Sequence, residues 1–213
     1  MSVIDVFSYI CRDSMNNKKV GIMTLNTSNN YGAVLQAYAL SRFLSEQGYE
    51  PFFVDYRDER VGVFRYLQHP LATMQKLIAI ESPTQALLSV MGKAISEQQE
   101  QKELQLAKIF DCFRGRYFNV TDRAYSHKML VETCPEAMAY ICGSDAVWAA
   151  DVYFKAPAYL LDFVPDKVKK ISYAPSFGKG TLEPYQVATF KKCLNTFDAV
   201  SVREQSGLEI IKS

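Results

Sequence analysis

The sequence contains neither closely spaced cysteines nor a recognisable set of metal-binding or hydrolytic residues. Its five cysteines are scattered and odd in number, and none forms a CxxC pair. This argues against a disulfide framework and against a zinc site, so we expect a reducing, cytoplasmic setting and no bound metal. The two histidines, His69 and His127, fall in segments predicted to be irregular, with no Ser-Asp pattern nearby. A hydrolase triad is therefore not indicated.

An excess of one charge and long apolar runs are also missing. The 24 Lys and Arg residues balance 23 Asp and Glu residues, for a net charge of +1, which gives no electrostatic reason to expect a nucleic-acid partner. No apolar run approaches the roughly 20 residues that cross a membrane. Residues 1–17 lack the basic start of a signal peptide. We therefore predict no nucleic-acid partner and no membrane span, with residues 1–17 forming an N-terminal extension.

The chain does contain a clear strand–loop–helix–strand unit between Lys18 and Arg57. The pattern predicts a strand at 19–25, a polar loop at 26–32, a helix at 33–47 and a strand at 49–56. A right-handed crossover of this kind places the loop at the carboxyl edge of a parallel sheet. Open α/β sheets bind their ligands at that edge.

Strands continue to alternate with helices after residue 138. Strands are predicted at 139–142, 169–176 and 199–202, and helices at 182–197 and 204–211. This alternation predicts an α/β fold, a three-layer Rossmann-like domain at 18–213 with a mainly parallel sheet. No G-x-G-x-x-G follows the first strand, so an ordinary dinucleotide-binding fold has little support.

Residues from about 60 to 117 read as a helical insertion in this domain, almost wholly polar at 96–103. Three interpretations of the insertion remain open. It could cover a substrate site, contact a second copy of the chain in a homo-oligomer, or form a solvated helix without a partner.

Several loops that follow predicted strands carry polar, aromatic or basic side chains suited to binding sugar hydroxyls or an anion. The candidate binding residues are Asn29, Asn30, Tyr31, Gly32, Gln36, Gly143, Ser144, Trp148, Ser176 and Arg203. Structural alternatives are open for three groups among them. The amides of the first loop could satisfy one another across a tight turn. Trp148 could anchor the core, and Arg203 could pair with Glu204.

Four stretches, in order, resemble motifs of the polysaccharide pyruvyl transferase family. One departure from the family pattern is Ala146, where members commonly have glutamine. The resemblance spans roughly Lys19 to the C-terminus. The stretches are SNNYGAVLQAYAL with GYEPFFVDYR near the start, ICGSDAVW at 141–148, ISYAPSFG at 171–178 and DAVSVREQSGLEII at 198–211.

The resemblance implies an enzyme that moves the pyruvyl unit of phosphoenolpyruvate onto a sugar of a surface polysaccharide or its precursor, forming a ketal. The donor methylene carbon must be protonated, two hydroxyls attack in turn, and a base accepts their protons. We interpret Asp145 as that base, because a glycine-led turn exposes it; capping of a following helix is the alternative. Phosphoenolpyruvate is then a donor substrate and no cofactor is expected. The acceptor is a saccharide or a lipid-linked saccharide.

The resemblance also implies a glycosyltransferase-B-like architecture, with two Rossmann-like domains and a site between them. This chain would supply the N-terminal, acceptor-side domain, with the donor-binding basic residues expected beyond Ser213. Two other functions remain open on the same fold. One is a non-catalytic saccharide-binding or assembly module, and the other is a different group transferase.

Overall fold

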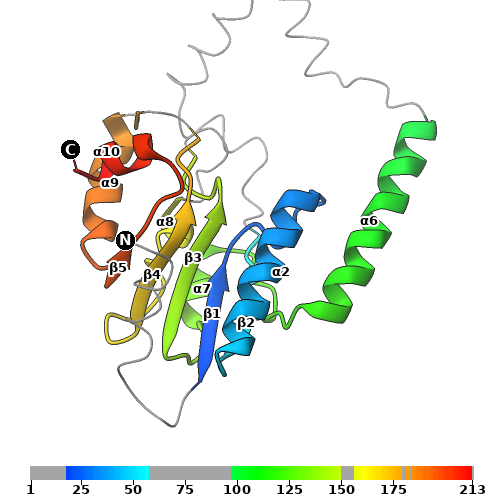
Figure 1. The fold of residues 1–213 in the computed structure, drawn as a ribbon, viewed down its shortest axis with the longest axis horizontal. Coiled ribbons are helices and arrows are strands. Elements are labelled where there is room, and N and C mark those ends of the chain that lie inside the picture. The colour runs from blue at the N-terminus through cyan, green and yellow to red at the C-terminus, as the bar shows by residue number, and fades with distance from the viewer. Residues whose placement is uncertain (1–17, 58–96, 150–155, 179–180, 183, 213) are drawn as a thin grey trace, which may run out of the picture. The chain divides into compact units, whose positions relative to one another are not determined.

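The computed structural model describes most of the chain (Figure 1). The chain divides into two units, one made of Met1–Asp58 with Gly115–Ser213 and the other of Glu59–Arg114. The predicted extension at 1–17 lies outside the described residues. So does most of the predicted insertion, of which helix α6 (Glu97–Tyr117) is described. The described residues are 18–57, 97–149, 156–178, 181–182 and 184–212.

Five strands of the first unit form one sheet in the order β2-β1-β3-β4-β5, and each neighbouring pair is parallel (Figure 1). The predicted α/β fold with a parallel sheet is confirmed. Residues 119–124 run alongside the end of β2, through bridges from Phe53 to Val120 and from Tyr56 to Ala124. The strands are β1 (Lys19–Met23), β2 (Glu50–Phe53), β3 (Ala139–Asp145), β4 (Lys169–Pro175) and β5 (Ala199–Val200).

Helices flank this sheet, with α2 in front of it and α7 behind it in Figure 1. The prediction of an irregular segment around His127 is wrong, because His127 opens α7. Ser126 caps that helix by accepting a hydrogen bond from the backbone N–H of Met129. Six residues are too few for a helical period to show in the sequence. The helices of this unit are α2 (Tyr31–Glu46), α7 (His127–Glu132), α8 (Ala156–Tyr159), α9 (Pro184–Leu194) and α10 (Gln205–Lys212).

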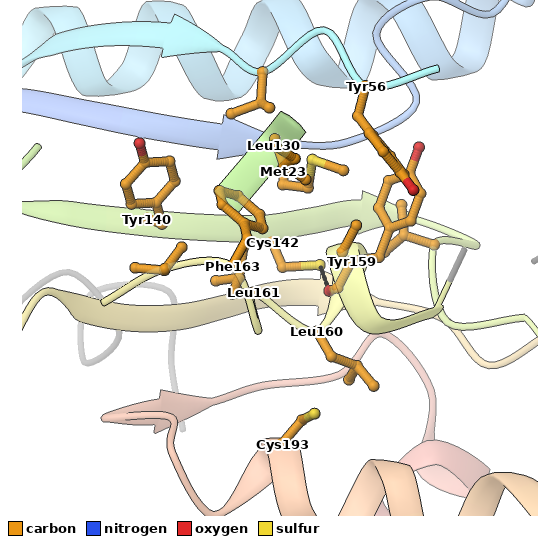
Figure 2. Packing of buried hydrophobic residues seen from close by; sticks show 14 of the residues in the cluster. Met23, Tyr56, Leu130, Tyr140, Cys142, Tyr159, Leu160, Leu161, Phe163 and Cys193 are labelled. Carbon is orange, nitrogen blue, oxygen red and sulfur yellow. Dashed lines mark hydrogen bonds between the residues drawn. The ribbon is translucent and has the colours of Figure 1, made fainter. Parts of the chain in front are cut away.

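Both faces of the sheet are buried, as expected for parallel strands between helical layers. In β3, Tyr140 and Cys142 face one side and Ile141 the other, and all three are fully buried. Figure 2 shows Tyr140 and Cys142 packed with the segment after α8, where Phe163 meets the Tyr140 ring edge-on at 5.5 Å. Gly21 of β1 makes room for that ring, because a Cβ there would lie 2.3 Å from a Tyr140 ring carbon.

The carbonyl of Tyr159 ties the segment after β3 to the sheet. It accepts hydrogen bonds from Cys142 Sγ at 2.7 Å (Figure 2) and from Trp148 Nε1 at 3.0 Å. Burial raises the pKa of the Cys142 thiol above its usual range, so the thiol stays protonated and acts as a donor. No helix in the described ranges is long and apolar enough to cross a membrane.

We expect the stability of the fold to decline in alkali, with Cys142 responsible for part of the decline. A thiol in the unfolded chain ionises near pH 8.5, whereas the folded Cys142 keeps its proton well above that pH. The contribution is therefore fully present below about pH 8.5. It falls by about 1.4 kcal/mol per pH unit above that pH, since the unfolded state binds fewer protons. Burial also raises the pKa of Tyr140, which adds to the decline at higher pH.

Urea unfolding between about pH 8 and pH 10 measures this slope. The variant Cys142→Ala should show a shallower decline than the wild type. The Tyr159 carbonyl keeps its Trp148 donor in that variant, so the loss of the thiol is not confounded by an unsatisfied carbonyl. An unchanged slope would show that Cys142 titrates in the folded protein as it does in the unfolded chain.

Candidate functional site

The strand order reverses between β1 and β3, which makes their carboxyl ends the topological switch point of the sheet. From β1 the chain crosses to β2 on one side, and β3 lies on the other side of β1. In open α/β sheets, ligands bind in the crevice at such a point. We call this position in the sheet the switch-point crevice. The sequence-predicted residues that follow β1, and those at the end of β3, lie at this position.

At the switch point, a chain of hydrogen bonds joins α2 to the end of β3 through Thr24, the residue after β1. Gln36 Nε2 donates to Thr24 Oγ1 at 3.0 Å and to the carbonyl of Ala33 at 2.9 Å. Thr24 Oγ1 in turn donates to the carbonyl of Ser144 at 2.9 Å. We call Gln36, Thr24 and Ser144 the relay. Thr24, which is only 1% exposed, was not among the predicted site residues.

The relay fixes which way the Gln36 amide points. Because the Thr24 hydroxyl gives its proton to Ser144, its oxygen must accept from the Gln36 NH₂ group. The other amide atom, Gln36 Oε1, is then buried with no hydrogen-bond partner among the described residues. A buried acceptor without a partner costs about 1–3 kcal/mol. A donor that reaches this oxygen would remove that cost.

The first loop presents its other candidates to the outside. Asn30 caps α2, its Oδ1 accepting a hydrogen bond from the backbone N–H of Ala33 at 3.1 Å. Asn29, Asn30 and Gly32 are exposed, and the Tyr31 side chain is 60% exposed. Mutual satisfaction of Asn30 and Gln36 is not observed, since each bonds to other partners.

The last residues of β3, 143–145, have an uncommon backbone conformation, and the strand extends beyond its predicted end at residue 142. Gly143 has φ 107° and Asp145 has φ 98°, and the peptide bond between Gly143 and Ser144 is cis. Positive φ is costly for a residue with a Cβ and often accompanies functional sites. The carbonyl of Asp145 accepts from the Ser176 N–H at 2.9 Å, which secures the end of β3 to the residue after β4.

The Asp145 side chain is partly exposed, and its Oδ1 accepts from the N–H of Ala146 at 2.7 Å. Residues 146–149 form a turn, so Asp145 caps no helix within the described residues that follow it. Its other carboxylate oxygen has no hydrogen-bond partner in the described part of the chain. The alternative of a helix cap is therefore not what the structure shows.

Trp148 and Ser176 are buried, so neither is exposed to a ligand at the switch point. The Trp148 side chain is 1% exposed and contacts Phe177 and Phe190, so the core alternative holds and the stacking interpretation is wrong for this indole. Ser176 is 2% exposed, and its hydroxyl accepts from the Gly178 N–H at 3.0 Å. The sequence could not predict the burial of Trp148, because that burial depends on packing against α8 and α9.

Arg203 is not brought to the relay. It follows β5, which lies two strands from β3 in the sheet. Its Nε lies 3.6 Å from Glu204 Oε2, so the ion-pair alternative is what the structure shows. Glu204 also accepts from the Phe177 N–H at 3.0 Å, which connects the end of β5 to the loop after β4.

We expect Thr24 and Gln36 to be energetically coupled. Thr24→Val leaves the Ser144 carbonyl without its donor and should destabilise the fold by about 1–3 kcal/mol. Gln36→Leu combined with it should cost less than the sum of the single changes, by about 0.5–3 kcal/mol. Denaturant unfolding of the four proteins of the cycle gives this coupling free energy. Additivity within about 0.5 kcal/mol would contradict the relay.

A matched cycle controls for general effects of removing a threonine hydroxyl. Thr133 Oγ1 donates to the Met129 carbonyl in α7, away from the switch point. Thr133→Val and Gln36→Leu should therefore be additive.

The described residues contain no group of three or more His, Cys, Asp or Glu side chains that could hold a metal ion. A family profile described as polysaccharide pyruvyl transferase matches residues 30–213, which cover most of the chain, including α2 and the loops after β3 and β4. Comparison with curated proteins and with solved structures finds no match.

Proposed function

The chain belongs to the polysaccharide pyruvyl transferase family, and on that basis we propose that its switch-point crevice binds the saccharide acceptor of a pyruvyl transfer. In this proposal phosphoenolpyruvate is the donor and the product is a ketal. The observation that carries the proposal is the relay. It connects two segments of the matched range, α2 and the end of β3, at the edge where this class of sheet binds ligands.

The exposed groups around the relay are of the types that bind sugars. The Asn30 side chain offers its NH₂ group, and Asp145 offers a carboxylate oxygen. The Tyr31 ring at the start of α2 can serve as the aromatic platform, since Trp148 is buried. A sugar hydroxyl that reached Gln36 Oε1 would supply the donor that this oxygen lacks.

The donor needs different chemistry, which is why we assign the acceptor to this crevice. Phosphoenolpyruvate carries a carboxylate and a phosphate, and both call for cationic groups or several N–H donors. The relay, Asn30 and Asp145 supply amides, hydroxyls and one carboxylate instead. A carboxylate beside a bound phosphate would repel it, whereas beside a sugar hydroxyl it can accept a proton.

We assign the base to Asp145. The donor methylene carbon takes up a proton, and the adjacent carbon, now cation-like, is attacked by one acceptor hydroxyl. Asp145 accepts the proton of that hydroxyl as the new C–O bond forms. Phosphate leaves with the electrons of its C–O bond, and the second hydroxyl attacks the same carbon to close the ketal, its proton passing to the departing phosphate or to water.

Incubation of the protein with phosphoenolpyruvate and hexose glycosides that carry two neighbouring free hydroxyls tests the proposal. We expect release of inorganic phosphate that depends on the glycoside, with a product that carries the pyruvyl ketal by mass spectrometry. Saturable binding of a glycoside without phosphate release would favour a non-catalytic saccharide-binding module. If no glycoside bound and no glycoside caused phosphate release, that result would contradict the proposal.

A further inference from the structure

Two arginines share one buried carboxylate at the end of β2. Asp55 Oδ1 lies 3.2 Å from Arg57 Nε, and Asp55 Oδ2 lies 3.0 Å from Arg123 Nε. The Asp55 side chain is 10% exposed, whereas Arg57 and Arg123 are 47% and 39% exposed. We call Arg57 and Arg123 the arginine pair. In these two ion pairs of the described residues, two cations thus share one anion.

The backbone holds the arginine pair in place. The Asp55 carbonyl accepts from the Ala124 N–H at 2.8 Å, and the Arg57 N–H donates to the Ala124 carbonyl at 2.9 Å. The Asp55 N–H donates to Thr121 Oγ1 at 3.1 Å. Residues 68 positions apart in the chain, Asp55 and Arg123, are therefore fixed side by side.

Each guanidinium contacts Asp55 through Nε, so its Nη groups do not bind that carboxylate. The Tyr125 hydroxyl is a further hydrogen-bond partner of Arg123. The guanidinium of Arg123 also lies 5.9 Å from the centre of the Tyr125 ring, and its hydrogen bond to Asp55 raises its pKa. Two arginine guanidiniums held at one carboxylate are of the type that binds the oxygens of a phosphate.

The arginine pair lies beside the switch point. The Val54 N–H donates to the Ile22 carbonyl at 3.0 Å, so the chain continues alongside β1 past the end of β2. This register places Asp55 next to Thr24, about one strand spacing of 4.8 Å away. An anion held by the arginine pair would therefore be close to a saccharide in the crevice.

We propose that Arg57 and Arg123 bind a phosphate group attached to the saccharide acceptor, so that the acceptor is a phosphate-bearing saccharide. This inference rests on the proposed function. The phosphate of phosphoenolpyruvate has the same chemistry, and the experiment below separates the two sources. The carboxylate of Asp55 positions the two guanidiniums and does not itself contact the phosphate.

Isothermal titration of the whole chain with a hexose 1-phosphate, the parent hexose and phosphoenolpyruvate tests the proposal. We expect the hexose 1-phosphate to bind more tightly than the hexose. Arg57→Gln and Arg123→Gln should each weaken hexose 1-phosphate binding by about tenfold or more. Both should leave binding of the hexose and of phosphoenolpyruvate unchanged. Arg42→Gln is the matched control, because Arg42 is also exposed and paired with a carboxylate, Glu46, but on the surface of α2.

If either variant fails to fold, the wild-type protein still gives an answer. The Nε–H resonances of Arg57 and Arg123 should shift on addition of hexose 1-phosphate, while that of Arg42 should not. Equal affinity of both arginine variants and the wild type for hexose 1-phosphate would overturn the proposal. So would a loss of affinity for phosphoenolpyruvate alone. If either of these results is found in a protein that still transfers pyruvyl groups, the phosphate site is wrong and the proposed function stands. If the protein binds hexose 1-phosphate through the arginines but transfers no pyruvyl group, only the proposed function is contradicted.

Discussion

Asp145→Asn is expected to slow pyruvyl transfer by roughly two to four orders of magnitude, the usual range for the loss of a general base. The melting temperature should stay close to that of the wild type. Asparagine keeps the oxygen that accepts from the Ala146 N–H at 2.7 Å. It is also among the residues that best tolerate the positive φ of 98° at this position. The substitution therefore removes the base while the loop keeps its shape.

Steady-state phosphate release with a saturating glycoside measures this effect, and Asp166→Asn is its matched control. Asp166 is 97% exposed and precedes β4, at the opposite edge of the sheet from the crevice. We expect the control to retain wild-type turnover. Turnover of Asp145→Asn within a few-fold of the wild type would mean that another group accepts the hydroxyl proton.

Gly143→Ala should destabilise the fold by about 3 kcal/mol or more. A Cβ at this position would lie 2.4 Å from the Tyr173 carbonyl oxygen and 3.2 Å from the Pro175 nitrogen. Both are backbone atoms of the paired strand β4, so no side-chain rotation can relieve the contact. The φ of 107° adds its own cost for a residue that carries a Cβ.

Gly48→Ala separates the two parts of that effect. Gly48 also has a positive φ, of 84°, but a Cβ there would meet nothing within 4 Å. Its alanine variant should therefore cost only the roughly 1–2 kcal/mol of the left-handed conformation. Urea unfolding of both variants measures the difference. Equal losses would show that the close approach of β3 and β4 at Gly143 does not matter for stability.

The fold could be predicted because its signals are local. Each strand is a short, largely apolar run, and β1, β4 and β5 are each followed by a polar loop and a segment with helical spacing. Parallel pairing follows from that alternation, and it brings the ends of β1 and β3 to one edge. The short helices α7 and α8 were not predicted, because four to six residues carry no readable period.

The relay shows what local patterns cannot supply. Thr24 and Ser144 are 120 positions apart, and their hydrogen bond depends on the strand order. The available signal was weak: Thr24 is a polar residue at the end of a buried strand. The arginine pair also depends on long-range pairing. Arg57 lies two residues from Asp55 in the sequence, but Arg123 contacts Asp55 only because its segment pairs with the end of β2.

Trp148 illustrates the opposite error. A lone tryptophan after a Gly-Ser-Asp turn is well placed for stacking on a sugar, and its position in the sequence is close to the crevice. Its burial depends on Phe177 and Phe190 and on a hydrogen bond to the Tyr159 carbonyl. None of these contacts is implied by the residues next to it. An aromatic residue near a site is thus placed reliably only when the elements that cover it are known.

The location of the acceptor in the switch-point crevice is tested most directly by titrating the ¹⁵N-labelled protein with a hexose glycoside and following the backbone and side-chain amide signals. We expect the largest shifts at Asn30, Gln36, Ser144 and Asp145. Shifts confined instead to the apolar groove of about 480 Å³ between α9 and α10, around Phe190 and Ile211, would place the saccharide elsewhere and contradict the assignment.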